Sequence, residues 1–504
     1  MWRKGWPVAA PVVIFALSLI PLTVTPVLPL IDFYNHIARF FVLAHVDASP
    51  FLQRYYEARW SLLPNIGVDV LGTPLLALLP PLLAAKAITV IIMAVIYGGA
   101  LYFHRAVTGT RSLLVAVLLA PLLYSYILNW GFANFLLGMG LVFWTAGWWL
   151  RMRHRPALAV PVSCLLALVI FFCHGVAFAL YCVLVLSLEI GAFLTASRRD
   201  PVQLLRALAL LALTAALPAL YFLLWMTGQA GGDSAVPALN LAPIPFSERA
   251  IRAGLYHLRT ILRVEEGPFE WFDAATFVTQ IVAIGILLRV GKLGIPPHAR
   301  FMAATVIFLA ALPLPTLFGV GHIGDRTPLF AALALIGALS VRPGAWTGIA
   351  RLMGGLLVAI AVIRIAAISV HWHAYAMTYD EFRSIAAHIR PQSLTMGIAA
   401  GSGKHATHAP RCEMYGPLLI AELGHAGPLF ADEKQQPLRL IGPMNGGGAA
   451  GRRAPLEYRD QVIGPLGAGY DDILVCNANL LPEPVPDGVR AVAASEHFVL
   501  LRRQ

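Results

Sequence analysis

Residues 83–104 read LAAKAITVIIMAVIYGGALYFH and carry one charged side chain, Lys86. A helix needs about 20 such residues to cross the hydrocarbon core of a bilayer. Similar apolar runs recur along the chain, which has 504 residues, is 58% hydrophobic and 12% charged, and has a mean hydropathy of +0.72. So few polar side chains exclude a soluble enzyme and predict a polytopic membrane protein, a helical bundle in its fold class.

The apolar runs predict about eleven spans, and two of the connections between them are very short. The expected spans are 7–29, 83–104, 112–128, 132–150, 157–173, 175–195, 203–227, 273–290, 301–319, 327–341 and 352–370. The hinges at 129–131 and 174–175 could instead be kinks inside longer helices, which would reverse the orientation of everything after them. The first run follows Arg3 and Lys4 as in a signal peptide, but its prolines and the absence of a cleavage site favour a retained span.

Basic residues gather in every second connection with few acids beside them, and such residues favour the cytoplasmic side. We therefore attribute the formal net charge of +11 to residues that set the orientation of the chain in the membrane. No nucleic-acid motif accompanies this charge. The pattern predicts a bacterial inner membrane protein with a cytoplasmic amino terminus. With an odd number of spans, the outer face receives loops at 31–82 and 228–272 and the tail. We therefore expect a transmembrane domain over 1–370 and an extracytoplasmic α/β domain over 371–504.

The tail reads as ordinary globular sequence. An amphipathic helix is expected to open at 379–383 and to stop at Arg390-Pro391, and glycines at 401–404 and 446–448 lack phosphate-loop spacing and predict turns. Strand candidates follow at 395–400, 438–441, 473–476 and 498–501. Cys412 and Cys476 could pair if the tail is extracytoplasmic, whereas Cys164, Cys173 and Cys182 are expected to act as small hydrophobic residues.

The segment 29–41, PLIDFYNHIARFF, directly follows the first span. On a helix, Asp32, His36 and Arg39 share one face and apolar side chains form the other. One interpretation is an interfacial helix that Asp32 caps and from which Arg39 reaches lipid headgroups. The other is a reactive site, in which Asp32 accepts a proton from an acceptor hydroxyl or holds a divalent cation while His36 and Arg39 bind a phosphate.

A second polar segment of the first loop, 51–60, mixes Arg54 and Arg59 with Tyr56 and Trp60. It is typical of an aromatic belt at a bilayer surface, and sugar stacking on Tyr56 or Trp60 is the alternative. A further interfacial helix is expected at 68–79, ending before Pro80-Pro81.

Four more candidates lie at outer span ends. His174 is either a structural residue or part of a substrate path. Asp325 and Arg326 either neutralise each other or mark such a path, and His322 adds a third polar group there.

Together these features resemble the GT-C superfold of membrane glycosyltransferases. The resemblance lies in a first span, an acid directly after it, two interfacial helices in a large first outer loop, many more spans and an outer α/β tail. More closely, the Asp-x-x-x-His-x-x-Arg motif at 32–39, with Pro64-Asn65 and residues 131–138 downstream, looks like a large group of bacterial membrane proteins.

The resemblance implies transfer of a sugar from a polyprenyl-phosphate carrier to a glycan or lipid acceptor on the outer face. Asp32 matches the first-loop acid of the family. Many relatives carry a second acid; here Phe33 follows, so Asp47 or Glu57 would have to serve. No cofactor is certain, and a divalent cation stays open.

The expected mechanism is a single displacement in which Asp32 orients or deprotonates the acceptor hydroxyl. Arg39, Arg54 or Arg326 would stabilise the departing phosphate. Two other functions stay open: a multi-span transporter or lipid flippase without transferase activity, and a scaffold whose tail binds an envelope partner.

Overall fold

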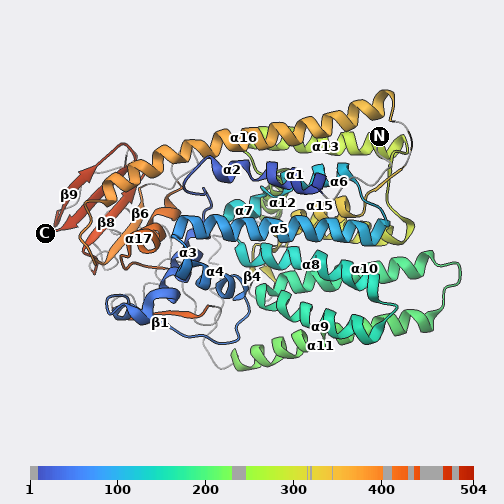
Figure 1. Ribbon diagram of the computed structural model, residues 1–504, viewed down its shortest axis with the longest axis horizontal. Coiled ribbons are helices and arrows are strands. Elements are labelled where there is room, and N and C mark those ends of the chain that lie inside the picture. Colours follow the sequence, from blue (N-terminus) through green and yellow to red (C-terminus); the bar gives the residue numbers. More distant parts are fainter. Residues whose placement is uncertain are drawn as a thin grey trace. The chain divides into compact units, whose positions relative to one another are not determined.

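The structure is a computed structural model that describes residues 9–229, 246–314, 316–317, 320–342, 344, 346–400, 411–429, 436–442, 469–478 and 487–504. The chain, whose helices and strands are drawn in Figure 1, forms two compact units. Unit 1 comprises Met1–Ser18, Ile92–Ile127 and Asn134–Ile365, and unit 2 comprises Leu19–Ile91, Leu128–Ala133 and Ala366–Gln504.

Among the described residues, eight helical segments are long and apolar enough to cross a membrane. They are α5 (Pro81–Thr108), α6 (Leu113–Leu122) together with α7 (Tyr126–Trp130), α8 (Ala133–Met152), α9 (Pro156–Cys173), α10 (Gly175–Thr195), α11 (Pro201–Gln229), α13 (Glu270–Arg289) and α16 (Gly348–Ala386). The other three expected spans hold shorter helices, α1 (Ala9–Ser18) with α2 (Ile20–Thr23), α14 (Arg300–Ala311) and α15 (Ile323–Gly337). Every expected span thus contains a helix, and the chain is a multi-span membrane protein.

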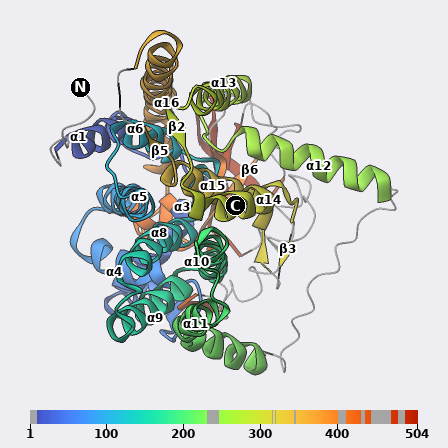
Figure 2. The same ribbon diagram turned by 90° about the vertical axis from the view of Figure 1, so that its right-hand side faces the viewer.

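The two short hinges are true breaks between helices. At the first, α7 ends at Trp130, Gly131 has a φ of +85°, and α8 begins at Ala133. At the second, His174 is extended between α9 and α10. Helices α9, α10 and α11 then pack side by side, as Figure 2 shows.

Small residues bring α5 and α8 into backbone contact inside unit 1. A Cβ added at Gly99 would lie 2.5 Å from the carbonyl oxygen of Gly140, and one added at Gly140 would lie 2.8 Å from the nitrogen of Ile96. Without a hydrophobic force between helices in lipid, such close approach supplies the van der Waals contact that holds spans together.

The loop expected at 228–272 contains a helix that the sequence did not predict, α12 (Phe246–Leu262); residues 230–245 lie outside the described part of the chain. Short pieces complete unit 1: η3 (Pro297–Ala299), the pair β2 (Leu293–Gly294) with β5 (Ser340–Val341), and the pair β3 (Thr316–Leu317) with β4 (Val320–Gly321).

Helix α16 corrects the expectation of a separate helix opening at 379. It runs for 39 residues without interruption, so the last span and the first helix of the tail are one element. No proline lies between 371 and 378 to end it, and it stops ahead of Arg390-Pro391 as expected.

The tail in unit 2 is built on a four-stranded sheet of order β6-β8-β10-β9, with β6 parallel to β8 and the other pairs antiparallel. The strands are β6 (Thr395–Ala399), β8 (Asp472–Cys476), β9 (Val489–Ala494) and β10 (Phe498–Arg503). Figure 1 shows α17 (Tyr415–Leu423), which follows η4 (Cys412–Met414), beside this sheet. Strand β9 was not predicted, and the glycine runs at 401–404 and 446–448 lie outside the described residues.

The strand expected at 438–441 does form, but it belongs to a different ladder. β7 (Leu438–Leu440) pairs antiparallel with β1 (Tyr56–Ala58) of the first loop, with Tyr56 opposite Leu440. The same loop holds η1 (Val46–Ala48) and η2 (Leu52–Arg54) and its two expected helices, α3 (Phe33–His45) and α4 (Gly67–Leu78). The first loop and the tail therefore fold as one unit.

Candidate active site around Asp32

Asp32 stands at the start of α3, and its carboxylate is not used to cap that helix. The side chain makes no capping hydrogen bond and instead accepts one from Asn35 Nδ2 at 2.9 Å. It is 37% exposed, yet burial by the surrounding protein raises its pKa from 3.8 to about 6; the Asn35 hydrogen bond and the charge of Arg39 act in the opposite direction. The capping interpretation is therefore wrong. The carboxylate of Asp32 is accessible, and its pKa lies close to neutral pH.

The backbone at Asp32 is fixed by the hinge at 129–131. Ile31 N donates to the carbonyl oxygen of Asn129 at 2.8 Å, and Asp32 N donates to that of Trp130 at 3.0 Å. Gly131 packs so tightly here that an added Cβ would lie 2.4 Å from Phe33 N. A segment far along the chain thus sets the position of the acid.

Arg39 is held by an acid that the sequence reading did not single out. Its Nε lies 2.6 Å from Asp69 Oδ1 and its Nη2 lies 3.2 Å from Asp69 Oδ2, and the two residues are 1% and 0% exposed. Asp69 was detectable as the one carboxylate in the otherwise apolar stretch 67–78. Because this bidentate pair satisfies the guanidinium in the interior, Arg39 supports the fold of α3 against α4.

His36 lies between Arg39 and Asp32 on α3. Arg39 Nη2 lies 2.8 Å from His36 Nδ1, and a guanidinium can only donate, so Nδ1 accepts and the proton sits on Nε2. That Nε2 lies 4.0 Å from Asp32 Oδ2. Burial, reinforced by the charge of Arg39, lowers the pKa of His36 well below its usual value, so the ring is neutral.

Helix α3 does not lie on a lipid surface with its polar face outward, as the interfacial interpretation required. His36 and Arg39 are buried, and so are Phe33, Ile37 and Phe40 on its other sides. The helix packs against α4 and α17 within unit 2. The polar face points into protein, and Asp32 alone of the trio keeps substantial exposure.

The remaining first-loop candidates lie elsewhere. Tyr56 is 1% exposed, and its hydroxyl donates to Gly427 O at 2.6 Å and accepts from Gly427 N at 2.9 Å, so it ties the loop to the tail and is not available for sugar stacking. Arg59 is exposed and pairs with Glu57 at 3.0 Å. Arg54 is also exposed, and Trp60 is 49% exposed.

Among the residues that the structure describes, no three His, Cys, Asp or Glu side chains come together in a group that could hold a metal ion. Of the two acids considered as partners of Asp32, Asp47 is exposed on η1, and Glu57 is engaged by Arg59 and by Arg439.

A second polar group lies in unit 1. His322, in the left-handed conformation with a φ of +59°, places Nδ1 2.8 Å from Asp325 Oδ2. Asp325 also accepts from the hydroxyls of Tyr256 and Thr260, each at 3.3 Å. Asp325 is thus held by these three neighbours, and its negative charge also interacts with the adjacent Arg326.

The other two candidates in unit 1, Arg326 and His174, both lie against the ring of Phe135. The Arg326 guanidinium carbon lies 5.3 Å from the centre of the Phe135 ring, and the His174 ring lies 5.5 Å from it, edge to face. His174 also caps α10 by accepting from Val176 N at 3.1 Å. The structural reading of His174 is therefore confirmed in part, since a cap is a structural role.

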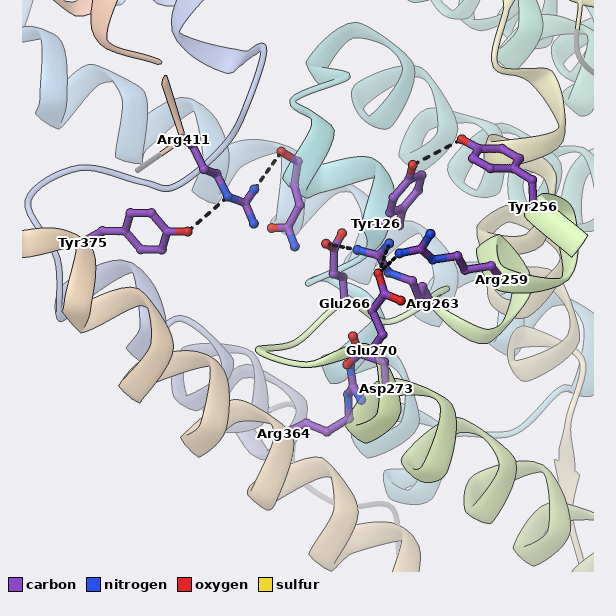
Figure 3. Close-up of polar contacts among 11 residues, drawn as sticks. Tyr126, Tyr256, Arg259, Arg263, Glu266, Glu270, Asp273, Arg364, Tyr375 and Arg411 are labelled. Atoms are coloured by element: carbon purple, nitrogen blue, oxygen red, sulfur yellow. Dashed lines mark hydrogen bonds and ion pairs between the residues drawn. The ribbon is translucent and has the colours of Figure 1, made fainter. Parts of the chain in front are cut away.

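Unit 1 further contains ion pairs that the sequence did not predict. Arg364, fully buried within α16, lies 2.9 Å from Glu265 and 2.9 Å from Asp273; Figure 3 shows Arg364 beside Asp273. Arg263 contacts Glu266 at 2.6 Å and Glu270 at 3.2 Å, and Arg259 also reaches Glu270. Beside them α12 and α13 border a surface hollow of about 290 Å³, lined by Leu255, Leu258, Arg259, Leu262, Arg263, Glu270, Trp271 and Ala274.

Comparison with known proteins gives one clear result, at the level of fold. No protein-family model and no curated protein matches the chain. The solved structure of ArnT from Cupriavidus metallidurans in the apo state aligns over 99% of this chain and 97% of its own, with a TM-score of 0.52 and 13% identity. The structure of the same protein bound to undecaprenyl phosphate gives a TM-score of 0.49 at 13% identity, over 99% and 98% of the two chains. This chain therefore shares the fold of ArnT, a GT-C glycosyltransferase, and the fold predicted from its sequence is confirmed.

Proposed function

We propose that the chain is a membrane glycosyltransferase that moves a sugar from a polyprenyl-phosphate carrier to an acceptor on the extracytoplasmic face. The proposal rests on the state of Asp32. Its carboxylate is accessible, makes no capping hydrogen bond to α3, and has a pKa raised to about 6. A general base works best when its pKa lies near the working pH.

The chemistry is a single displacement. The acceptor oxygen forms a bond to the anomeric carbon as the bond from that carbon to the carrier phosphate breaks, and the acceptor proton passes to Asp32. Neutral His36 lies beside the carboxylate, with Nε2 4.0 Å from Asp32 Oδ2, and its ring carries no charge that would pair with it; the hydrogen bond that orients Asp32 comes from Asn35. Arg39 and Asp69 hold His36 in that tautomer and act as positioning residues.

The orientation draws support from the tail. Cys412 and Cys476 form a disulfide, and such bonds persist in oxidising compartments. Together with the clustering of basic residues in alternate connections, this favours a tail beyond the cytoplasmic membrane.

The test compares envelope glycans and glycolipids by mass spectrometry in a deletion strain complemented with wild type, Asp32→Asn or Asp380→Asn. Asp380 is exposed on α16, so the last variant is a matched control. Wild type and the control should restore a sugar mass increment that Asp32→Asn reduces about 100-fold or more. An unchanged increment in Asp32→Asn, at equal protein level, would contradict the transferase and favour a transporter or scaffold.

A further inference from the structure

Arg411 presents a guanidinium that the described fold leaves poorly satisfied. Its Nε donates to Tyr375 Oη at 3.4 Å and its Nη1 to Asn129 O at 3.5 Å, and both distances exceed the usual 2.7–3.2 Å range. Figure 3 shows the two weak contacts. Among the described residues no carboxylate lies within ion-pair distance of this half-buried side chain.

Arg411 lies at the entrance to α3. The carbonyl oxygen of Asn129 that receives Arg411 Nη1 also accepts from Ile31 N at 2.8 Å, and Ile31 precedes Asp32. The guanidinium and the accessible carboxylate therefore flank the same hinge. Arg39 is different, since Asp69 already balances its charge in the interior.

A covalent bond fixes the backbone at this arginine. Cys412 follows Arg411 directly and is bonded to Cys476, the last residue of β8. Strand β8 lies between β6 and β10 in the tail sheet, and α17, which follows Cys412, packs on α3. The disulfide thus joins the segment carrying Arg411 to a strand of the tail sheet that is paired on both sides.

We propose that Arg411 binds the phosphate of the polyprenyl-phosphate carrier beside Asp32, and that the Cys412–Cys476 disulfide positions it. This inference rests on the proposed function. The planar guanidinium fork matches two phosphate oxygens, and an anion supplies the counter-charge that the described residues do not. During transfer, the electron pair of the breaking bond between the anomeric carbon and oxygen moves onto the phosphate, where Arg411 stabilises the charge.

The first experiment measures binding of undecaprenyl phosphate and of undecaprenol, which lacks the phosphate, to the full chain in phosphatidylcholine nanodiscs. Arg411→Gln should weaken undecaprenyl phosphate binding about 10-fold or more and leave undecaprenol binding unchanged. Arg490→Gln, an exposed arginine on β9, serves as the matched control and should alter neither. Equal affinity of Arg411→Gln and wild type for undecaprenyl phosphate would overturn the inference, as would equal affinity of wild type for inorganic phosphate.

The second experiment tests positioning by the disulfide. The double variant Cys412→Ser with Cys476→Ser should weaken undecaprenyl phosphate binding several-fold, and Arg411→Gln added to it should cost less than in wild type. Full additivity of the two effects would show that the disulfide does not act through Arg411.

Failure of the inference and failure of the proposed function give different results. Asp32→Asn should bind undecaprenyl phosphate at least as tightly as wild type, because a negative charge beside the phosphate is removed, while losing transfer. If wild type itself does not bind undecaprenyl phosphate, the proposed function fails; if wild type binds and Arg411→Gln binds equally well, only the role of Arg411 fails.

Discussion

Asp32, His36 and Arg39 lie on one face of α3, yet their surroundings give them different chemistry. Arg39 is 1% exposed and paired, and His36 is neutral, whereas Asp32 keeps 37% of its side-chain exposure. A helix face therefore groups candidate residues, and access to solvent selects which of them can meet a substrate.

The pKa of Asp32 predicts the pH dependence of transfer. Burial raises this pKa from 3.8 to about 6, and a base must be deprotonated to act, so kcat/KM should rise with pH through about 6 and level off above about 7. Initial transfer rates between about pH 5 and pH 8 measure this. In wild type, the hydrogen bond from Asn35 stabilises the charged form of Asp32. Asn35→Ala removes this bond and should therefore move the midpoint of the pH–rate profile to higher pH. Transfer rates that do not change between about pH 5 and pH 8 would argue against a base with this raised pKa.

Gly131→Ala should disturb the site through the hinge. The new Cβ would lie 2.4 Å from Phe33 N at a residue whose φ is +85°, so the hinge must move away from Asp32. We expect a loss of about 1–3 kcal/mol in stability and a larger fractional loss of transfer, measured by thermal unfolding and by rate. Gly109→Ala is the control, since its φ is +71° but no atom lies within 4 Å of the added Cβ. Equal effects of the two substitutions would mean that the contact with α3 is unimportant.

At the scale of elements, charge pairing and close packing hold spans together. Helix α16 contains Arg364 within its apolar segment. The carboxylates of Glu265 and Asp273 balance the positive charge of this arginine. An ionised group at such a position is tolerated only with partners of this kind.

Arg364→Met should destabilise the chain by about 3–5 kcal/mol, because two buried acids lose their counter-charge. Thermal unfolding in detergent would show a lower midpoint. Adding Glu265→Gln and Asp273→Asn should recover much of the loss, and Arg351→Met, at an exposed position of the same helix, should have little effect. No recovery in the triple variant would contradict the ion-pair explanation.

Gly140→Ala should separate α5 from α8. Its Cβ would meet backbone, with Ile96 N at 2.8 Å, and backbone cannot rotate aside as a side chain can. A loss of about 1–3 kcal/mol is expected in the same unfolding measurement. Gly285→Ala in α13, where nothing lies within 4 Å, should be neutral, and a neutral Gly140→Ala would refute the close contact.

At the scale of the whole molecule, the orientation can be tested by labelling introduced cysteines. Glu496→Cys in the tail should react with a membrane-impermeant maleimide in intact spheroplasts. Ser197→Cys, in the exposed basic connection after α10, should react only after lysis. The reverse pattern would invert the proposed topology.

The spans could be read from the sequence because apolar length is a local property. Pairings that join distant segments could not. Asp69 was missed because its partner lies on another helix. Arg411 was missed because its contact with the hinge at Asn129 joins segments that are far apart in the sequence. The pairing of β7 with β1 was missed because a strand pattern does not specify its neighbour. Continuity of α16 was missed because a change from apolar to polar sequence does not by itself end a helix.

The β1–β7 ladder has a consequence for biosynthesis. It ties residues near 57 to residues near 439, and the Tyr56 hydroxyl reaches Gly427, 371 positions later. The ribosome therefore releases nearly the entire polypeptide before the early loop can adopt its final form. The first loop, which carries Asp32, therefore cannot complete its structure until the last segment of the chain has been synthesised.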